Sequence, residues 1–381
     1  MKTVEKVKHP LTEEQKRMYA SEKLMNFRWI SKMLASCSPY VLKSSDVVPV
    51  DLQMELAEIG QFTELAYSSV PISFVFDHLS SLLHDDFPFE GYDALQDATL
   101  VADFHGDVAD LHAFAAYRPK NKQLIVSIAG TSTALQGLYD VWGTRRRHPS
   151  GKGEVHRGFW SLYTGLRSFI LDSIRKGLAE QDVTELVVTG HSMGGAMSYL
   201  LLLELLTPND IVPPSLCIKL AAFGAPRVGD ANLGNYWQEL CQEYRNSNGV
   251  DSFKEYSVKA YNDGVPSLPP LKLGYRHFTR EPLYFVHGRM FRVPSAESEY
   301  AFFQVGDLSD SSAPSEHPKG GHNYYNGRDQ EKFLRRMRWL NDALAKSVKD
   351  KDWQRRYRKY VARHAKGASP SSSSSRSNST S

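Results

Sequence analysis

Cysteine is scarce in this chain of 381 residues, and so are long uncharged stretches. The three cysteines, Cys37, Cys217 and Cys241, lie far apart and form neither a CxxC pair nor a metal-type spacing with histidine. This argues against both a disulfide framework and a zinc site. The first residues, MKTVEKVKHPLTEEQKR, carry a charge every few positions and lack the apolar run of a secretory signal. We therefore expect a cytoplasmic protein.

Residues 186–203 form one stretch without a charge, which reaches the minimum length of a membrane span. The stretch contains Gly190, His191 and Ser192, and its first half has the pattern of a strand while its second half has that of a helix. We interpret it as buried core.

Charge is unevenly distributed along the chain, although its net value is only +3. Residues 346–381 contain ten lysines and arginines against two acidic residues, and the remainder holds 36 basic and 41 acidic residues. A weakly acidic body argues against nucleic-acid binding, and any attraction to an anionic membrane is placed in the tail. With 41% hydrophobic and 23% charged residues, the composition is that of a globular protein.

Apolar periodicity predicts alternating helices and strands. The expected helices are 12–36, 51–68, 161–179, 194–206, 231–245 and one from about 328, and the expected strands are 110–118, 123–129, 186–189, 217–223 and 256–261. Thr12 and Gln15 have the spacing of a capping box at the first helix. The alternation predicts an α/β fold with a largely parallel sheet covered by helices on both faces.

The segment Gly190-His191-Ser192-Met193-Gly194 fits the pattern GxSxG. It follows an expected strand and precedes an expected helix, where the backbone must turn sharply and present the serine hydroxyl. The start of the helix also supplies N–H groups for an oxyanion. The alternative is a glycine-rich structural turn.

A serine hydroxyl is a weak nucleophile unless a histidine and a carboxylate activate it. Asp263 and His322 follow Ser192 in the order Ser, Asp, His. Asp263 ends an expected strand, although an ordinary turn aspartate would also fit. His322 lies in a loop before the last helix, and His317 and His287 are its rivals.

Five segments together resemble the class 3 lipases, the family of the fungal triacylglycerol lipases. They are Gly130-Thr131-Ser132, Val155 to Phe159, Thr189 to Ala196, Gly224 to Asp230 and Asn262 to Pro270. They occur in the family's order and cover about residues 50–340. The resemblance implies an α/β-hydrolase-like fold, hydrolysis of lipid carboxylic esters, and His322 as the base.

By the same resemblance, Thr131 and Met193 would form the oxyanion hole. The family usually has an aromatic residue and an arginine before Gly130, whereas Ile128 and Ala129 stand here, so the wall of the site differs. Three further residues match the family and are expected to have a structural role: His156, Arg227 and Asp230.

The segment after Thr131 places four apolar residues on one face of a short helix: Leu135, Leu138, Tyr139 and Trp142. In the family this position holds a lid, and the alternative is an ordinary surface helix. In the segment 353–366, aromatic residues lie on one side and dense positive charge elsewhere. That pattern is typical either of a helix at a lipid surface or of a solvated continuation of the last helix.

We interpret the chain as a serine hydrolase that cleaves lipid esters through Ser192, His322 and Asp263 and needs no cofactor or metal. The expected partner is the lipid ester, with peripheral contact to a lipid droplet or anionic membrane and none to nucleic acid. Phospholipase A activity, non-lipid esterase activity and a catalytically silent regulatory protein stay open as alternatives. The expected division is a helical N-terminal extension (1–49), a catalytic domain (50–345), and a basic helix with a disordered serine-rich tail (346–381).

Overall fold

The computed structural model describes residues 10–20, 26–130, 144–306, 316–325, 327–346 and 352–366. Thr131 and the four residues of the expected lid face, Leu135, Leu138, Tyr139 and Trp142, lie outside these ranges. The serine-rich tail beyond residue 366 lies outside them as well. The predictions for these parts stay predictions.

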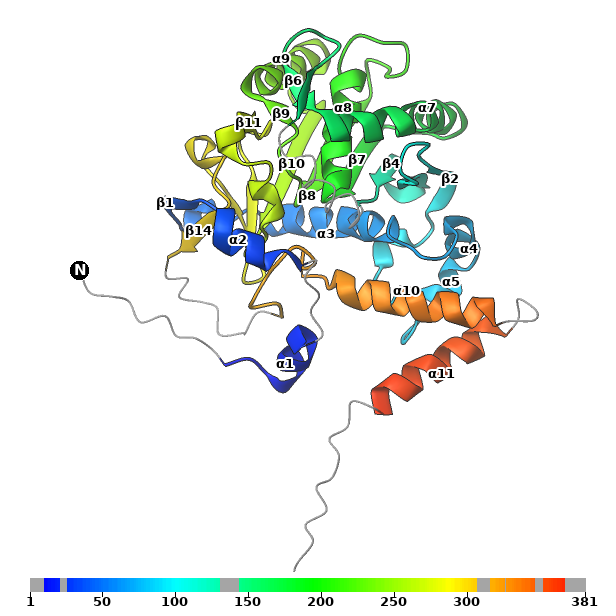
Figure 1. The fold of residues 1–381 in the computed structure, drawn as a ribbon. Coiled ribbons are helices and arrows are strands. Elements are labelled where there is room, and N and C mark those ends of the chain that lie inside the picture. Colours follow the sequence, from blue (N-terminus) through cyan, green and yellow to red (C-terminus); the bar gives the residue numbers. More distant parts are fainter. Residues whose placement is uncertain are drawn as a thin grey trace, which may run out of the picture.

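An eight-stranded sheet forms the centre of the fold, in the order β13-β12-β10-β8-β7-β4-β3-β2 (Figure 1). Its strands are β2 (Thr99–His105), β3 (His112–Arg118), β4 (Gln123–Ile128), β7 (Glu185–His191), β8 (Cys217–Phe223), β10 (Phe253–Ala260), β12 (Leu283–Val286) and β13 (Arg289–Arg292). Strands β4, β7, β8, β10 and β12 run parallel, whereas β2, β3 and β13 pair antiparallel at the edges. The predicted, mostly parallel sheet of an α/β-hydrolase-like fold is confirmed.

Helices cover both faces of this sheet, as predicted (Figure 1). One face carries α7 (Arg157–Glu180), α8 (Met193–Leu205) and α9 (Ala231–Asn248); the other carries α3 (Val50–Leu65), α4 (Ile72–Asp77), α5 (Leu79–Leu82) and α10 (Gln330–Ala345). In β7, Leu186 and Val188 belong to the first core and Val187 to the second. Because successive side chains of a strand point to opposite faces, a strand covered on both sides is apolar throughout.

A small sheet in the order β11-β9-β6-β5 lies at the ends of α7 and α9. Its strands are β5 (Arg145–Arg147), β6 (Glu154–His156), β9 (Gly229–Asp230) and β11 (Tyr275–Arg276). His156 caps α7, because its Nδ1 accepts a hydrogen bond from the N–H of Phe159 at 3.3 Å. Asp230 caps α9 through the N–H of Leu233 at 2.9 Å. Both residues therefore have the scaffold role that the sequence indicated.

The N-terminal region differs from the single helix expected over 12–36. The structure has two helices, α1 (Glu13–Ala20) and α2 (Arg28–Leu34), and Phe27 between them has a left-handed backbone with φ 53°. The capping box is present, since Thr12 and Gln15 exchange hydrogen bonds of 3.0 and 3.1 Å. The region also contains β1 (Cys37–Leu42), which pairs in parallel with β14 (Phe302–Val305). It is therefore not helical throughout.

The C-terminal helix α11 (Trp353–Lys366) packs on the protein with its aromatic side. Trp353 is 2% exposed and Tyr357 is fully buried, and their rings contact Phe87. The interpretation in which this aromatic face meets a lipid surface is wrong, because the face is already covered by the second core. Among the described residues, no helix is both long enough and apolar enough to cross a bilayer.

Candidate functional site

Ser192 occupies a sharp turn between β7 and α8. Its backbone angles, φ 60° and ψ −128°, belong to a strained conformation that the surrounding contacts must hold. A Cβ at Gly190 would lie 2.3 Å from the carbonyl carbon of Gly194, and a Cβ at Gly194 would lie 2.0 Å from the carbonyl oxygen of Ile128. The two glycines of GxSxG are therefore required by close backbone contacts, as the pattern predicted.

Asp263 and His322 are in direct contact. The Nδ1–H of His322 donates to Oδ2 of Asp263 at 2.8 Å, and the N–H of Val265 donates to Oδ1 at 2.9 Å. The rival histidines contact other groups, since His317 stacks on Tyr324 and His287 lies against Tyr261. The histidine positioned to be oriented by Asp263 is therefore His322.

Two atoms of this site have no hydrogen-bond partner within the described part of the chain. They are Oγ of Ser192 and Nε2 of His322, and both are buried. Because Nδ1 of His322 carries the proton donated to Asp263, Nε2 of the neutral ring keeps a lone pair. The reactive oxygen of the expected nucleophile and the reactive nitrogen of the expected base therefore make no hydrogen bond to the described residues.

Tyr325 is a site residue that the sequence interpretation missed. Its hydroxyl donates to Oδ2 of Asp263 at 2.5 Å. Burial raises the pKa of Tyr325 well above its ordinary value, and the charge of Asp263 raises it further, so the hydroxyl keeps its proton and stays a donor. Gly224, with φ +59°, makes room, because a Cβ there would lie 2.7 Å from the tyrosine hydroxyl. The sequence signal that could have identified Tyr325 is its position three residues after His322.

His191 links the turn at Ser192 to the loop of His322. Its Nε2 donates to the carbonyl oxygen of His322 at 2.8 Å, which leaves Nδ1 to accept from the hydroxyl of Tyr67 at 2.9 Å. That hydroxyl accepts the N–H of Gly130 at 3.0 Å. Burial lowers the pKa of His191 well below its ordinary value, and His322 nearby lowers it further, so the ring stays neutral. One neutral network therefore joins three loops of the site.

Met193, the second expected oxyanion donor, is the first residue of α8. Its N–H belongs to the first turn, where backbone donors have no partner inside the helix. Ile128 and Ala129, which replace the family's usual residues, are both buried and pack into the two cores. The two residues that depart from the family pattern are therefore part of the cores beside Gly130.

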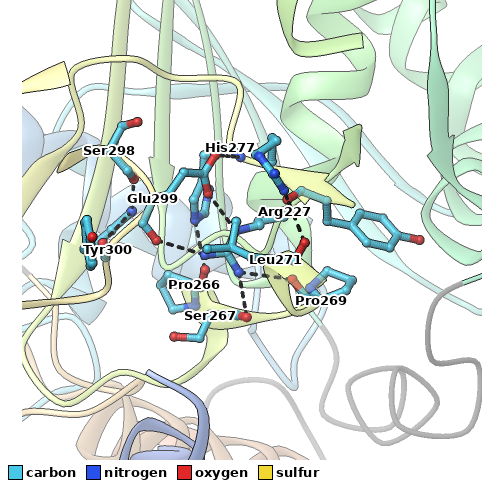
Figure 2. A network of polar contacts seen from close by, with 12 residues as sticks. Arg227, Pro266, Ser267, Pro269, Leu271, His277, Ser298, Glu299 and Tyr300 are labelled. Atoms are coloured by element: carbon cyan, nitrogen blue, oxygen red, sulfur yellow. Dashed lines mark hydrogen bonds and ion pairs between the residues drawn. The ribbon is translucent and has the colours of Figure 1, made fainter. Parts of the chain in front are cut away.

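Arg227 binds the backbone of the loop that follows Asp263 (Figure 2). Its Nη1 donates to the carbonyl oxygens of Ser267 at 2.6 Å and Pro269 at 3.0 Å, and its Nε pairs with Glu299 at 2.9 Å. Lys259 lies buried beside this pair and donates to the carbonyl oxygen of Tyr300 at 2.9 Å. Arg227 thus links the Asp263 loop to Glu299, in agreement with its expected scaffold role.

Comparison with known proteins gives the same fold. The "Rhizomucor miehei lipase propeptide complex" aligns with a TM-score of 0.57 over 85% of this chain and 95% of that one, at 19% identity. A triacylglycerol lipase whose catalytic centre is described as a serine protease triad aligns with a TM-score of 0.55 over 75% of this chain and 98% of that one, also at 19% identity. At this identity the likeness concerns the fold.

Sequence relatives are named as lipases. The chain is 34% identical over 186 residues to the "Secreted mono- and diacylglycerol lipase A" of Penicillium cyclopium, covering 48% of this chain and 55% of that protein. It is 26% identical over 190 residues to the "Lipase" of Rhizomucor miehei, covering 50% and 49%. The matches thus span about half the length of these relatives. Residues 125–273 match the family model "Lipase (class 3)", so this part of the chain is similar to the class 3 lipases.

Proposed function

We propose that this protein is a serine hydrolase that cleaves carboxylic esters of lipids, with acylglycerols as the substrate class. The observation that carries the proposal is the bond between Asp263 and His322, together with a strained Ser192 whose hydroxyl has no partner among the described residues and whose neighbour His191 binds the backbone of His322. The match of residues 125–273 to the class 3 lipase model supports the reaction type. Names of relatives, among them a mono- and diacylglycerol lipase, support the substrate class.

In the proposed reaction, Oγ of Ser192 attacks the ester carbonyl while Nε2 of His322 takes its proton. Asp263 holds the imidazole in the tautomer that leaves Nε2 free and stabilises the imidazolium that forms. The N–H of Met193 would bind the developing oxyanion, with Thr131 as the second donor that the family resemblance implies. His322 then protonates the leaving alcohol, and a water molecule activated by the same histidine releases the acid from the acyl-enzyme.

A substrate panel tests the proposal. It contains a mono-, a di- and a triacylglycerol, a phospholipid, and a short soluble ester, each assayed with wild-type protein and with Ser192→Ala. We expect hydrolysis of at least one acylglycerol that Ser192→Ala abolishes. Hydrolysis of the phospholipid alone would identify a phospholipase A, and of the soluble ester alone a non-lipid esterase. Absence of both turnover and fluorophosphonate labelling would identify a silent regulatory protein.

Contact with a lipid droplet or an anionic membrane is part of the proposal. In α11 the aromatic side is buried, whereas Arg355, Arg358, Lys359 and Arg363 are exposed. A surface contact of this helix would therefore be electrostatic, and it should weaken as salt is raised. Co-sedimentation with anionic and neutral vesicles at low and high salt measures it, and equal binding to both kinds of vesicle would contradict it.

A further inference from the structure

The segment 26–30 lies against the loops of both His322 and Asp263, although about 230 to 300 positions of sequence separate this segment from those loops. It precedes the residues that match the class 3 lipase model, and His322 follows them. The contacts between these two outlying segments are therefore a feature that the family match leaves undescribed.

Asn26 binds three residues of the His322 loop. Its backbone oxygen accepts the N–H of His322 at 2.9 Å, and its Oδ1 accepts the N–H of Asn323 at 2.9 Å. Its Nδ2 donates to the carbonyl oxygen of Gly320 at 3.3 Å. Asn26 is 1% exposed, so these bonds are made away from water, where an unpaired polar group is costly.

The His322 loop is shaped to receive this side chain. A Cβ at Gly321, which has φ +121°, would lie 2.3 Å from both Oδ1 and Nδ2 of Asn26. On the other side, the N–H of Gly321 donates to the carbonyl oxygen of Tyr261 at 2.8 Å. The loop is thus held between Asn26 and Tyr261, which follows β10 and lies two residues before Asp263.

Phe27 and α2 complete the contact. The ring of Phe27 meets the imidazole of His322 edge to face, with 5.4 Å between centroids. Next to Asp263, a Cβ at Gly264 would lie 2.5 Å from Cβ of Ile30 and 2.7 Å from the carbonyl oxygen of Phe27. The same short segment therefore restrains the backbone beside both residues of the His322–Asp263 pair.

We propose that Asn26 is a positioning residue for His322, and that the segment 26–30 is an integral part of the active site. The proposal rests on the proposed function, because it assigns His322 the role of base. Asn26 acts through the backbone on both sides of the histidine, while His191 holds the carbonyl oxygen of the same residue. The imidazole is then fixed by its own backbone as well as by Asp263.

The test compares Asn26→Ala, Asn26→Asp and a matched control, Ser31→Ala, in the full chain. Ser31, the residue after this segment, is also buried, but its hydroxyl donates to the carbonyl oxygen of Arg28 within α2. For Asn26→Ala we expect kcat per folded molecule on a soluble ester to fall about 10- to 100-fold, with KM within about twofold, because the base is misplaced. Asn26→Asp keeps the acceptor for Asn323 but loses the donor to Gly320, so it should recover only part of that loss. Ser31→Ala should lower the melting temperature and leave kcat unchanged.

Amide hydrogen exchange gives a readout that does not need activity. In wild type and Ser31→Ala, the amides of residues 320–325 should exchange slowly, and in Asn26→Ala that of Asn323 should exchange faster at a temperature where all three stay folded. A lower melting temperature in Asn26→Ala with kcat per folded molecule unchanged would overturn the proposal. If wild type shows neither turnover nor fluorophosphonate labelling, the proposed function fails, and equal exchange in the three proteins would then overturn the contact itself.

Discussion

The imidazole of His322 donates a hydrogen bond of 2.8 Å to the carboxylate of Asp263, a residue 59 positions earlier in the chain. The carboxylate also accepts from Val265 and from Tyr325, so its orientation is fixed from three sides. A carboxylate held in this way can orient an imidazole without moving during the reaction.

Removing the hydroxyl in Tyr325→Phe should reduce catalysis while preserving the fold. The change takes one charge-assisted hydrogen bond from Asp263 and leaves a ring of nearly the same shape. We expect kcat/KM to fall about 10-fold, equivalent to about 1.4 kcal/mol of transition-state stabilisation. Steady-state kinetics on a soluble ester measures it. The control is Tyr244→Phe, whose hydroxyl binds the carbonyl oxygen of Leu216, and equal effects of the two changes would contradict the role of Tyr325.

Tyr67→Phe should affect both stability and rate. It leaves the N–H of Gly130 and Nδ1 of His191 without their buried partner, at a cost of about 1–3 kcal/mol for each unsatisfied group. Denaturant unfolding should show a loss of about 2–6 kcal/mol for the two groups together. Because Gly130 precedes the expected oxyanion donor Thr131, kcat should fall as well. If Tyr67→Phe is as stable and as active as wild type, the hydrogen bonds of Tyr67 contribute to neither stability nor catalysis.

Stability should depend on pH through Lys259. Burial, and then the charge of Arg227, lowers the pKa of Lys259 to about 7, whereas in the unfolded chain this pKa is near its ordinary value of 10.5. Between these two values the unfolded state binds more protons, so the contribution of this residue to stability rises with pH. Relative to Lys259→Met, wild type should gain about 2 kcal/mol between pH 7 and pH 9.

Urea unfolding of both proteins at the two pH values measures this gain. Taking the difference between wild type and variant removes the pH dependence of the groups they share. A difference that stays constant, or that shrinks as pH rises, would show that Lys259 remains charged in the folded protein.

Trp353→Ala should destabilise the protein by about 3–5 kcal/mol, since it removes a buried indole that contacts Phe74 and Phe87. Lys359→Ala, at an exposed position of the same helix, should change the free energy of unfolding by less than about 0.5 kcal/mol. Denaturant unfolding distinguishes the two. Equal stability of both variants would mean that α11 is not docked through its aromatic side.

The central strands and helices could be predicted from the sequence because their patterns are local. The strands of the sheet are apolar runs buried on both faces, and GxSxG requires its glycines for contacts within a few residues of Ser192 and with β4. The order Ser, Asp, His and the family resemblance then singled out Asp263 and His322, which the structure brings together.

Long-range partners could not be predicted in this way. The pairing of β1 with β14, the docking of Trp353 and the bonds of Asn26 to residues 320–323 each depend on segments that local periodicity does not relate. The aromatic stripe of α11 is a clear example, because burial and a lipid surface select the same side chains. The contacts of Trp353 with Phe74 and Phe87 show that this stripe is buried in the protein.

The most direct test of the proposed catalysis is the rate of ester hydrolysis by four proteins: wild type, Ser192→Ala, His322→Ala and His317→Ala. Each is assayed on a diacylglycerol and on a short soluble ester, with circular dichroism to show that it is folded. We predict that Ser192→Ala and His322→Ala each lower kcat more than about 10³-fold, while His317→Ala retains most of it. Activity that survives in Ser192→Ala, or that is lost in His317→Ala but kept in His322→Ala, would contradict the account.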